Sequence, residues 1–268
     1  MSDSSGASSA SVRSSPDASR MFTGTSAFSV YVWLALLMIG ISIVGFWENY
    51  FGPLVRGTLN AHWAVDVHAA VYTVWLFLFL GQALLISRNR IRRHQTIGRY
   101  VGIGWGTGML IIGLFITLAV IVPSVGRDHE VGNYATSLLG SLGDLVTFGG
   151  FFVAGVLYRR RPEIHKRLMV LATVALMGAP VGRLVGHVGG GFIGKFSFLA
   201  GVRLSPAILA MIYDRWYWGR VHPVYWIGMG ILLLNVSRLL WARTGLWQST
   251  ARSLMETVAP LMRALLAS

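Results

Sequence analysis

Apolar segments of about 20 residues, the length that a helix needs to cross a bilayer, recur along this chain and decide which folds are open to it. The composition points the same way. Of the 268 residues, 54% are hydrophobic and 12% are charged, with a mean hydropathy of +0.60. A soluble domain carries about 25% charged residues. The sequence therefore predicts an all-α fold, a polytopic membrane helical bundle with no sizeable soluble domain.

We expect seven transmembrane helices at the apolar runs Ala27–Trp47, Val67–Ser87, Tyr100–Val122, Ser137–Tyr158, Arg167–Val188, Phe196–Tyr213 and Pro223–Ala242. Together they would form a helical bundle over residues 27–244. Residues 1–26 are rich in serine and are expected to form a disordered arm. Residues 245–268 have apolar side chains at helical spacing between polar ones, which predicts an amphipathic helix on the membrane surface.

Basic residues predict the orientation of the bundle. The chain has 23 Lys+Arg against 10 Asp+Glu, a net charge of +13. Most of the bases lie in the arm and in three connections between spans, at residues 88–99, 159–167 and 215–220, all on one side of the predicted bundle. The positive-inside rule then predicts a cytoplasmic N-terminus and an external C-terminus. Because the bases occupy short loops and no recognition motif accompanies them, we exclude nucleic acid as a partner.

The chain contains no cysteine. This excludes disulfides, thiolate-ligated iron–sulfur clusters, covalently attached c-type haem and cysteine-based zinc sites. Any metal ion or haem must therefore be held by histidine, methionine, tyrosine or a carboxylate.

Three basic connections share one plan: bases leave one span, and a single histidine stands where the next span begins. The histidines are His94, His165 and His222, within RNRIRRHQTIG, RRRPEIHKRLM and DRWYWGRVHPVYW. The positive end of a helix and nearby guanidinium groups both disfavour an imidazolium ion. Each ring should therefore be neutral and keep a free lone pair. Such a ring can bind a metal ion or haem iron, or accept a proton; alternatively, it is an interfacial residue that bonds helix-terminal amides.

Ionisable residues inside the spans are the second group of candidates. Asp144 in the fourth span and Arg183 in the fifth reach similar depths, which predicts a structural ion pair between them. His68 opens the second span and Arg203 lies deep in the sixth. A basic excess in a medium of low dielectric constant favours an anionic group. Haem propionates, a quinone oxygen or a lipid phosphate would each suit Arg183 and Arg203.

Several segments together resemble a family of uncharacterised bacterial multi-pass membrane proteins. They are HAAVYTVWLFLFLGQALL from His68, the H-x-x-x-G pattern at His94–Gly98, RRRPEIHKRLMVLAT, and YDRWYWGRVHP. They match the family's His-led second span and its HRxLG-like, HKRLM and Asp…HP motifs between Asp66 and Trp226, except that Gln95–Thr96–Ile97 stands where Arg and Leu are usual. The resemblance implies a bacterial inner-membrane protein with several functional histidines. A looser similarity to membrane b-type cytochromes implies haem held by histidines of different spans.

The sequence thus favours a membrane protein of electron transfer or redox chemistry. Haem b or a transition metal would be held by His94, His165 and His222, with His68, Arg183 and Arg203 as further cofactor-binding candidates. Membrane lipid, a quinone or another redox protein would be its partners. Two alternatives stay open: a proton-coupled transporter using Asp144, Arg183 and His68, and a non-catalytic membrane scaffold. Hydrolase motifs such as G-x-S-x-G and H-E-x-x-H are absent, and no catalytic residue is predicted.

Overall fold

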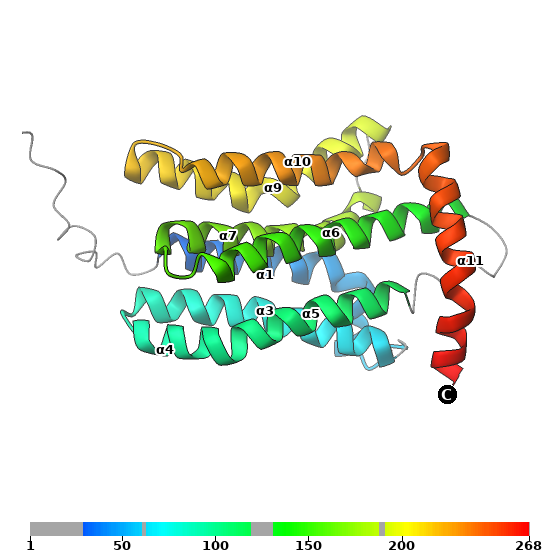
Figure 1. Ribbon diagram of the computed structural model, residues 1–268, viewed down its shortest axis with the longest axis horizontal. Coiled ribbons are helices and arrows are strands. Elements are labelled where there is room, and N and C mark those ends of the chain that lie inside the picture. Colours follow the sequence, from blue (N-terminus) through cyan, green and yellow to red (C-terminus); the bar gives the residue numbers. More distant parts are fainter. Residues whose placement is uncertain (1–28, 61–62, 119–130, 188–190, 268) are drawn as a thin grey trace, which may run out of the picture.

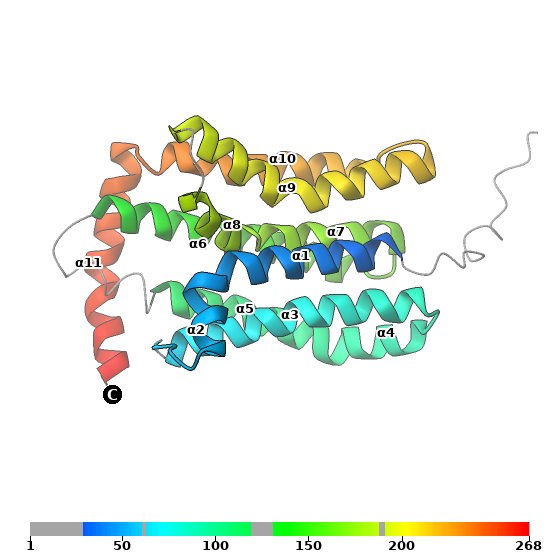
Figure 2. The same ribbon diagram turned by 180° about the vertical axis from the view of Figure 1, so that it is seen from behind.

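A computed structural model describes residues 29–60, 63–118, 131–187 and 191–267. Every regular element in these ranges is a helix. Most of the helices run side by side as a bundle, and the last one lies across one end of it (Figures 1 and 2). The all-α prediction is confirmed for this part of the chain. The predicted arm, residues 1–26, lies outside the described residues.

The helices follow one another along the chain as α1 (Val30–Phe46), the π-helix η2 (Trp47–Phe51), α2 (Gly52–Val55), α3 (Trp63–Ser87), α4 (Ile91–Ile97), the π-helix η3 (Gly98–Gly102), α5 (Ile103–Ile116), α6 (Val131–Leu157), α7 (Pro162–Ala175), α8 (Gly178–Leu184), the 3-10 turn η6 (Val185–His187), α9 (Gly191–Trp218), α10 (Pro223–Trp241) and α11 (Gly245–Ala267). Several of these elements join end to end into one longer helix, so the number of helical passes through the bundle is smaller than the number of labelled elements.

Six stretches of helix among the described residues are long and apolar enough to cross a membrane: Val30–Val55, Val65–Ser87, Ile91–Ile116, Ala135–Leu157, Pro162–Leu184 and Gly191–Trp218. They indicate a multi-pass membrane protein. Helix α10 has 19 residues and runs back alongside α9 (Figure 1). Its crossing of the membrane as a seventh span stays a prediction.

Two spans begin earlier than the apolar runs suggest. The third helix starts at Ile91, not at Tyr100, and the fifth starts at Pro162, not at Arg167. Arginine and lysine have good helix propensity, so a basic segment can extend a helix past the end of its apolar run. Proline is well suited to the first helical position, where its missing N–H leaves no bond unmade. The histidine-bearing segments therefore lie inside the first turns of these helices.

An aromatic layer crosses the middle of the bundle. The indole ring of Trp75 on α3 meets Phe148 and Phe152 of α6 edge-on, with ring centroids 5.3 Å and 5.7 Å apart. Its Nε1–H donates to Thr173 Oγ1 on α7 at 3.3 Å. The hydroxyl of Thr173 in turn donates to the carbonyl of Met169. This layer ties three helices together and separates the polar groups near one end of α3 from those near the other.

The helix pass that contains α7 breaks at Leu176–Met177, and α8 continues at a different angle (Figure 2). Helix α1 packs closely against α8, because Gly45 lies directly against the backbone of Pro180, where a β-carbon would overlap it. Small residues at such contacts allow transmembrane helices to approach closely.

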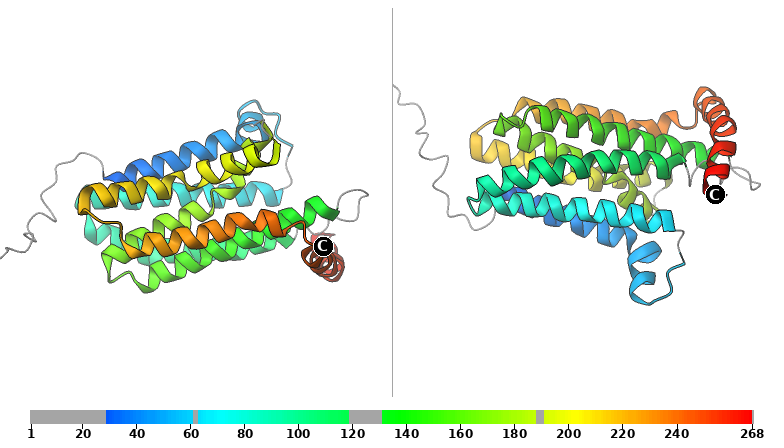
Figure 3. Two further views of the ribbon diagram at one scale, coloured as in Figure 1. Left: turned by 90° about the horizontal axis from the view of Figure 1, so that it is seen from above. Right: turned by 60° about the horizontal axis from the view of Figure 1, so that its bottom comes forward.

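The three basic connections gather at one end of the bundle together with the start of α1, and α11 lies across the other end (Figures 2 and 3). Helix α11 packs against α6 through Ala251, Met255 and Ala259. Trp247 Nε1–H also donates to the carbonyl of Ala135 at 2.8 Å. A helix is therefore present where the sequence predicts one. That it lies on the membrane surface stays a prediction.

Candidate functional site

The bundle brings His94 and His165 together at its basic end. Each is the fourth residue of its helix, His94 in α4 and His165 in α7. Their ring centroids are 6.3 Å apart and the ring planes are inclined by 76°. The two rings belong to helices far apart in sequence, so their meeting depends on the packing of the bundle.

Main-chain groups lie beside both rings, and one of them orients His165. Nδ1 of His165 bonds the carbonyl oxygen of Gly155 at 2.8 Å, which requires Nδ1–H and leaves Nε2 with a free lone pair. The main chain of Gln82 lies near the ring of His94, whose Nδ1 is buried without a hydrogen-bond partner. A main-chain contact therefore fixes one nitrogen of His165, whereas Nδ1 of His94 has no partner.

His222 has a different position, which corrects the prediction of a three-histidine site. It is the N-cap of α10, where its Nδ1 accepts a hydrogen bond from the Val224 N–H at 3.2 Å. Its own N–H donates to Asp214 Oδ2 at 3.2 Å. Burial lowers the pKa of His222 from its ordinary value, and the Arg167 guanidinium lowers it further, while the Asp214 carboxylate acts in the opposite direction. A ring that accepts this bond at Nδ1 must be neutral.

A metal centre built from many ligands is not present in the described ranges. Within them, no group of three or more His, Cys, Asp or Glu side chains could hold an ion. The repeated pattern of three histidines therefore divides in the fold. Two of the rings form a pair, and the third caps a helix.

Next to His222 lies a buried ion pair that sequence reasoning missed. Arg167 of α7 forms a two-pronged contact with Asp214 of α9, from Nε to Oδ2 and from NH2 to Oδ1, both at 2.8 Å. The side chains are only 2% and 1% exposed. Glu163 adds a third contact at 2.7 Å to NH1, and the guanidinium lies 5.7 Å from the ring centroid of Tyr225. In the sequence, only the Asp…HP motif pointed to this buried ion pair.

Deeper in the bundle, Asp144 of α6 binds two arginines. Its Oδ1 lies 2.5 Å from NH2 of Arg203 on α9 and 2.6 Å from NH1 of Arg238 on α10. NH2 of Arg203 also donates to the carbonyl of Ala175 at 2.9 Å, where α7 ends. The predicted partner was Arg183, and this is corrected: Arg203 and Arg238 hold the carboxylate instead.

Further polar groups complete this arrangement, which we call the Asp144 cluster (Asp144, Arg203, Arg238 and Asn235). The side-chain oxygen of Asn235 accepts a bond from Arg238 NH1, and its amide donates to the carbonyl of Gly143 and to the hydroxyl of Thr147, each at 2.7 Å. The cluster has one carboxylate and two guanidinium groups. It therefore carries the basic excess that the sequence predicts, with Arg203 as expected and with Arg238 in place of Arg183.

Arg183 and His68, two other predicted site residues, lie apart from the histidine pair. Arg183 is exposed on α8, with its guanidinium 4.5 Å from the ring centroid of Phe46 and NH1 donating to the Ala179 carbonyl at 3.2 Å. His68 stacks on Tyr72 with centroids 4.2 Å apart, and its Nδ1 is buried without a partner. His68 lies near the start of α3, whereas Gln82 beside His94 lies near its end. The aromatic layer at Trp75 separates the two.

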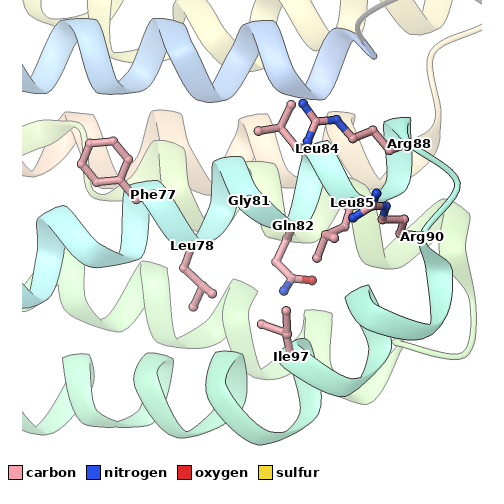
Figure 4. Close-up of a pocket in the computed structure, with 9 residues that line it drawn as sticks. All are labelled: Phe77, Leu78, Gly81, Gln82, Leu84, Leu85, Arg88, Arg90 and Ile97. Atoms are coloured by element: carbon pink, nitrogen blue, oxygen red, sulfur yellow. The ribbon is translucent and has the colours of Figure 1, made fainter.

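A groove runs between α3 and α4 close to the histidine pair (Figure 4). It encloses about 340 Å³ and is lined by Phe77, Leu78, Gly81, Gln82, Leu84, Leu85, Arg88, Arg90 and Ile97. Neither His94 nor His165 lines it. A haem macrocycle lying in this groove would therefore not meet the two rings.

Comparisons with protein-family models, with curated proteins and with solved structures find no match for this chain. The resemblance to a family of bacterial multi-pass membrane proteins stays a prediction from the motifs. The candidate site accordingly depends on its geometry alone. Sequence reasoning identified both members of the histidine pair, but it gave no role to Gln82. The feature that could have identified Gln82 is its polar amide within an apolar run.

Proposed function

We propose that this protein is an integral membrane protein of electron transfer that binds a transition-metal ion through His94 and His165. The observation that supports this proposal is the pairing of two imidazoles from different helices at 6.3 Å between ring centroids. Metal–imidazole bonds of about 2 Å allow one ion to bind nitrogens of two rings at such a separation after small ring rotations.

The main-chain contacts of the two rings suit this role. A histidine that ligates a metal usually bonds a carbonyl or carboxylate through its other nitrogen, which fixes the tautomer and the direction of the ring. His165 does so toward Gly155, and the main chain of Gln82 lies near the ring of His94. The nitrogens that would ligate the ion are Nε2 of His165 and Nδ1 of His94, neither of which has a hydrogen-bond partner among the contacts described above.

A bound ion would supply a centre able to change its oxidation state. The described residues offer the ion two strong protein ligands, so positions would remain for water or another small ligand. The geometry favours a single ion over haem b, because the groove nearby does not include either ring. Electrons would be exchanged with a quinone or with another redox protein. The positive-inside rule and the family resemblance support a place in the bacterial inner membrane.

The test is metal analysis of the full chain purified in mild detergent, combined with a reduced-minus-oxidised spectrum. We expect about one transition-metal ion per chain for the wild type. His94→Ala and His165→Ala should each lower the metal content by at least tenfold, since loss of one of two imidazoles removes most of the affinity. His222→Ala is the matched control and should keep the metal.

Two outcomes would contradict the proposal. One is a folded wild-type protein that is metal-free after growth and after reconstitution with Cu, Zn, Fe and Mn salts. The other is a His94→Ala, His165→Ala double variant that retains the wild-type metal content. A haem spectrum that depends on both histidines would keep the redox function and replace the single ion with haem b.

A further inference from the structure

The groove between α3 and α4 opens on the outside of the bundle, where a transmembrane protein meets lipid. Only 11% of the most apolar part of the span Val65–Ser87 is buried within the protein, against 61% for the span Pro162–Leu184. Much of its lining is apolar and includes Phe77, Leu78, Leu85 and Ile97 (Figure 4). A hydrocarbon chain would lie in it without exposing polar atoms to lipid.

Space along the groove is kept open by a glycine. A β-carbon built on Gly81 would meet no other atom within 4 Å, so this residue leaves a gap in the lining. Beside it, both polar atoms of the Gln82 side-chain amide are buried and lack a hydrogen-bond partner. An amide without a partner in an apolar setting costs free energy. A ligand with an acceptor oxygen at this depth would satisfy its NH2 group, though not its Oε1.

Positive charge lies at the end of the groove that faces the head groups. Arg88 and Arg90 line it directly after the last residue of α3. They are held there by a tight turn in which Asn89 adopts a left-handed conformation with φ of 55°. Neither arginine forms an ion pair with any other residue that the structure describes. Their charge is therefore available to an anion.

We infer that the groove is a binding site for one anionic phospholipid from the leaflet at the basic end of the bundle. One acyl chain lies along Phe77, Leu78 and Gly81, and an ester carbonyl accepts a bond from the Gln82 amide. The phosphate binds Arg88 and Arg90. Charge distinguishes this ligand from a quinone, because a neutral quinone gains little from two unpaired guanidinium groups.

The experiment measures retained lipid. The full chain is reconstituted in nanodiscs of equal phosphatidylglycerol and phosphatidylcholine, extracted in mild detergent, and examined by native mass spectrometry. We expect one retained phosphatidylglycerol and little phosphatidylcholine. Each basic residue near a membrane surface adds attraction equal to about fivefold in affinity. Arg88→Gln should therefore weaken retention about fivefold, and the Arg88→Gln, Arg90→Gln pair by about 30-fold.

A second variant tests the groove apart from its charge. Gly81→Phe fills the open space, so it should abolish retention while leaving the thermal stability of the protein close to that of the wild type. The matched control is Arg159→Gln, Arg160→Gln, which removes two bases from another connection at the same end and should retain lipid as the wild type does. Equal retention by Gly81→Phe and wild type, equal retention of both lipids, or a quinone in place of phospholipid would each overturn the assignment.

Discussion

Asp144 is the residue on which the deepest polar contacts of the bundle converge. Its carboxylate joins α6 to Arg203 of α9 and Arg238 of α10 at 2.5 Å and 2.6 Å. A carboxylate held by two guanidinium groups at these distances is well suited to locking three helices. The contacts therefore favour a structural role over the transporter alternative.

Replacing Asp144 with Asn should destabilise the protein by roughly 3 to 5 kcal/mol, because the buried Arg203 and the partly buried Arg238 lose their counter-charge. Thermal unfolding in detergent, followed by tryptophan fluorescence, measures the change. Glu256→Gln on the exposed face of α11 is the control and should leave the midpoint unchanged. A variant as stable as the wild type would show that the pair does not hold the helices together.

Gly178 is a second single-residue test of the same cluster. A β-carbon there would overlap Asp144 Oδ2 and lie 3.0 Å from Arg203 NH1. Gly178→Ala should therefore cost about 1 to 3 kcal/mol by overpacking. Gly182 lies on the same short helix and has nothing within 4 Å of an added β-carbon, so Gly182→Ala should be neutral or slightly stabilising. Similar midpoints for the two variants would contradict the described packing.

Helix depth could be read from the sequence, but helix rotation could not. Counting residues placed Asp144 and Arg183 at similar depths, and several arginines met the same criterion. The partner depends on which way each helix face points and on the break at Leu176–Met177, after which α8 turns away. Apolar runs with single polar residues and low amphipathicity do not encode that rotation. The carboxylate was therefore identified correctly, and its partner was not.

At the scale of helices, the starts of α4, α7 and α10 decide what their histidines do. His94 and His165 lie one turn inside their helices, whereas His222 precedes its helix as the cap. The sequence pattern of bases followed by one histidine is the same in all three. What differs is where the helix begins, and Pro223 sets this for α10 by directly following His222. The repeat predicted three histidines at helix starts, but not their separate roles.

The cap at His222 predicts a dependence on pH. Burial lowers its pKa below the ordinary 6.5, so between the folded and unfolded values the unfolded chain binds more protons. Stability from this group is therefore fully present above pH 6.5 and declines as the pH falls below it. The wild type should lose more stability between pH 7.5 and pH 5 than His222→Asn, because asparagine caps a helix without titrating.

Substitutions of His222 also distinguish a helix-capping role from a metal-binding role. His222→Ala should cost about 1 kcal/mol at pH 7.5 through the lost cap, and His222→Asn should restore most of it. Unfolding midpoints of the three proteins across the pH range give both quantities. If asparagine destabilises as much as alanine, or if the pH dependence persists in His222→Asn, the described cap is not the source of the effect.

At the scale of the whole molecule, the positions of the basic connections and of α11 bear on one question, which is whether α10 crosses the membrane. The basic connections gather at one end of the bundle and α11 lies at the other (Figure 2). The prediction that α10, a helix of 19 residues, crosses the membrane would place these two ends on opposite sides of it. The apolar runs predicted seven passes; six stretches among the described residues are long and apolar enough to cross a membrane, and the seventh stays a prediction. The bases predicted which connections share an end of the bundle. Sidedness itself depends on the positive-inside rule.

The absence of cysteine makes this claim directly testable, because any introduced thiol is the only one in the chain. Arg160→Cys, Arg220→Cys and Ser253→Cys place single thiols at exposed positions in the α6–α7 turn, the α9–α10 turn and α11. A membrane-impermeant maleimide should label Ser253→Cys in intact cells. The other two should be labelled only in inverted vesicles. Arg220 and Ser253 are separated by α10 alone, so labelling of both from the same side would show that α10 does not cross and that the bundle has six spans.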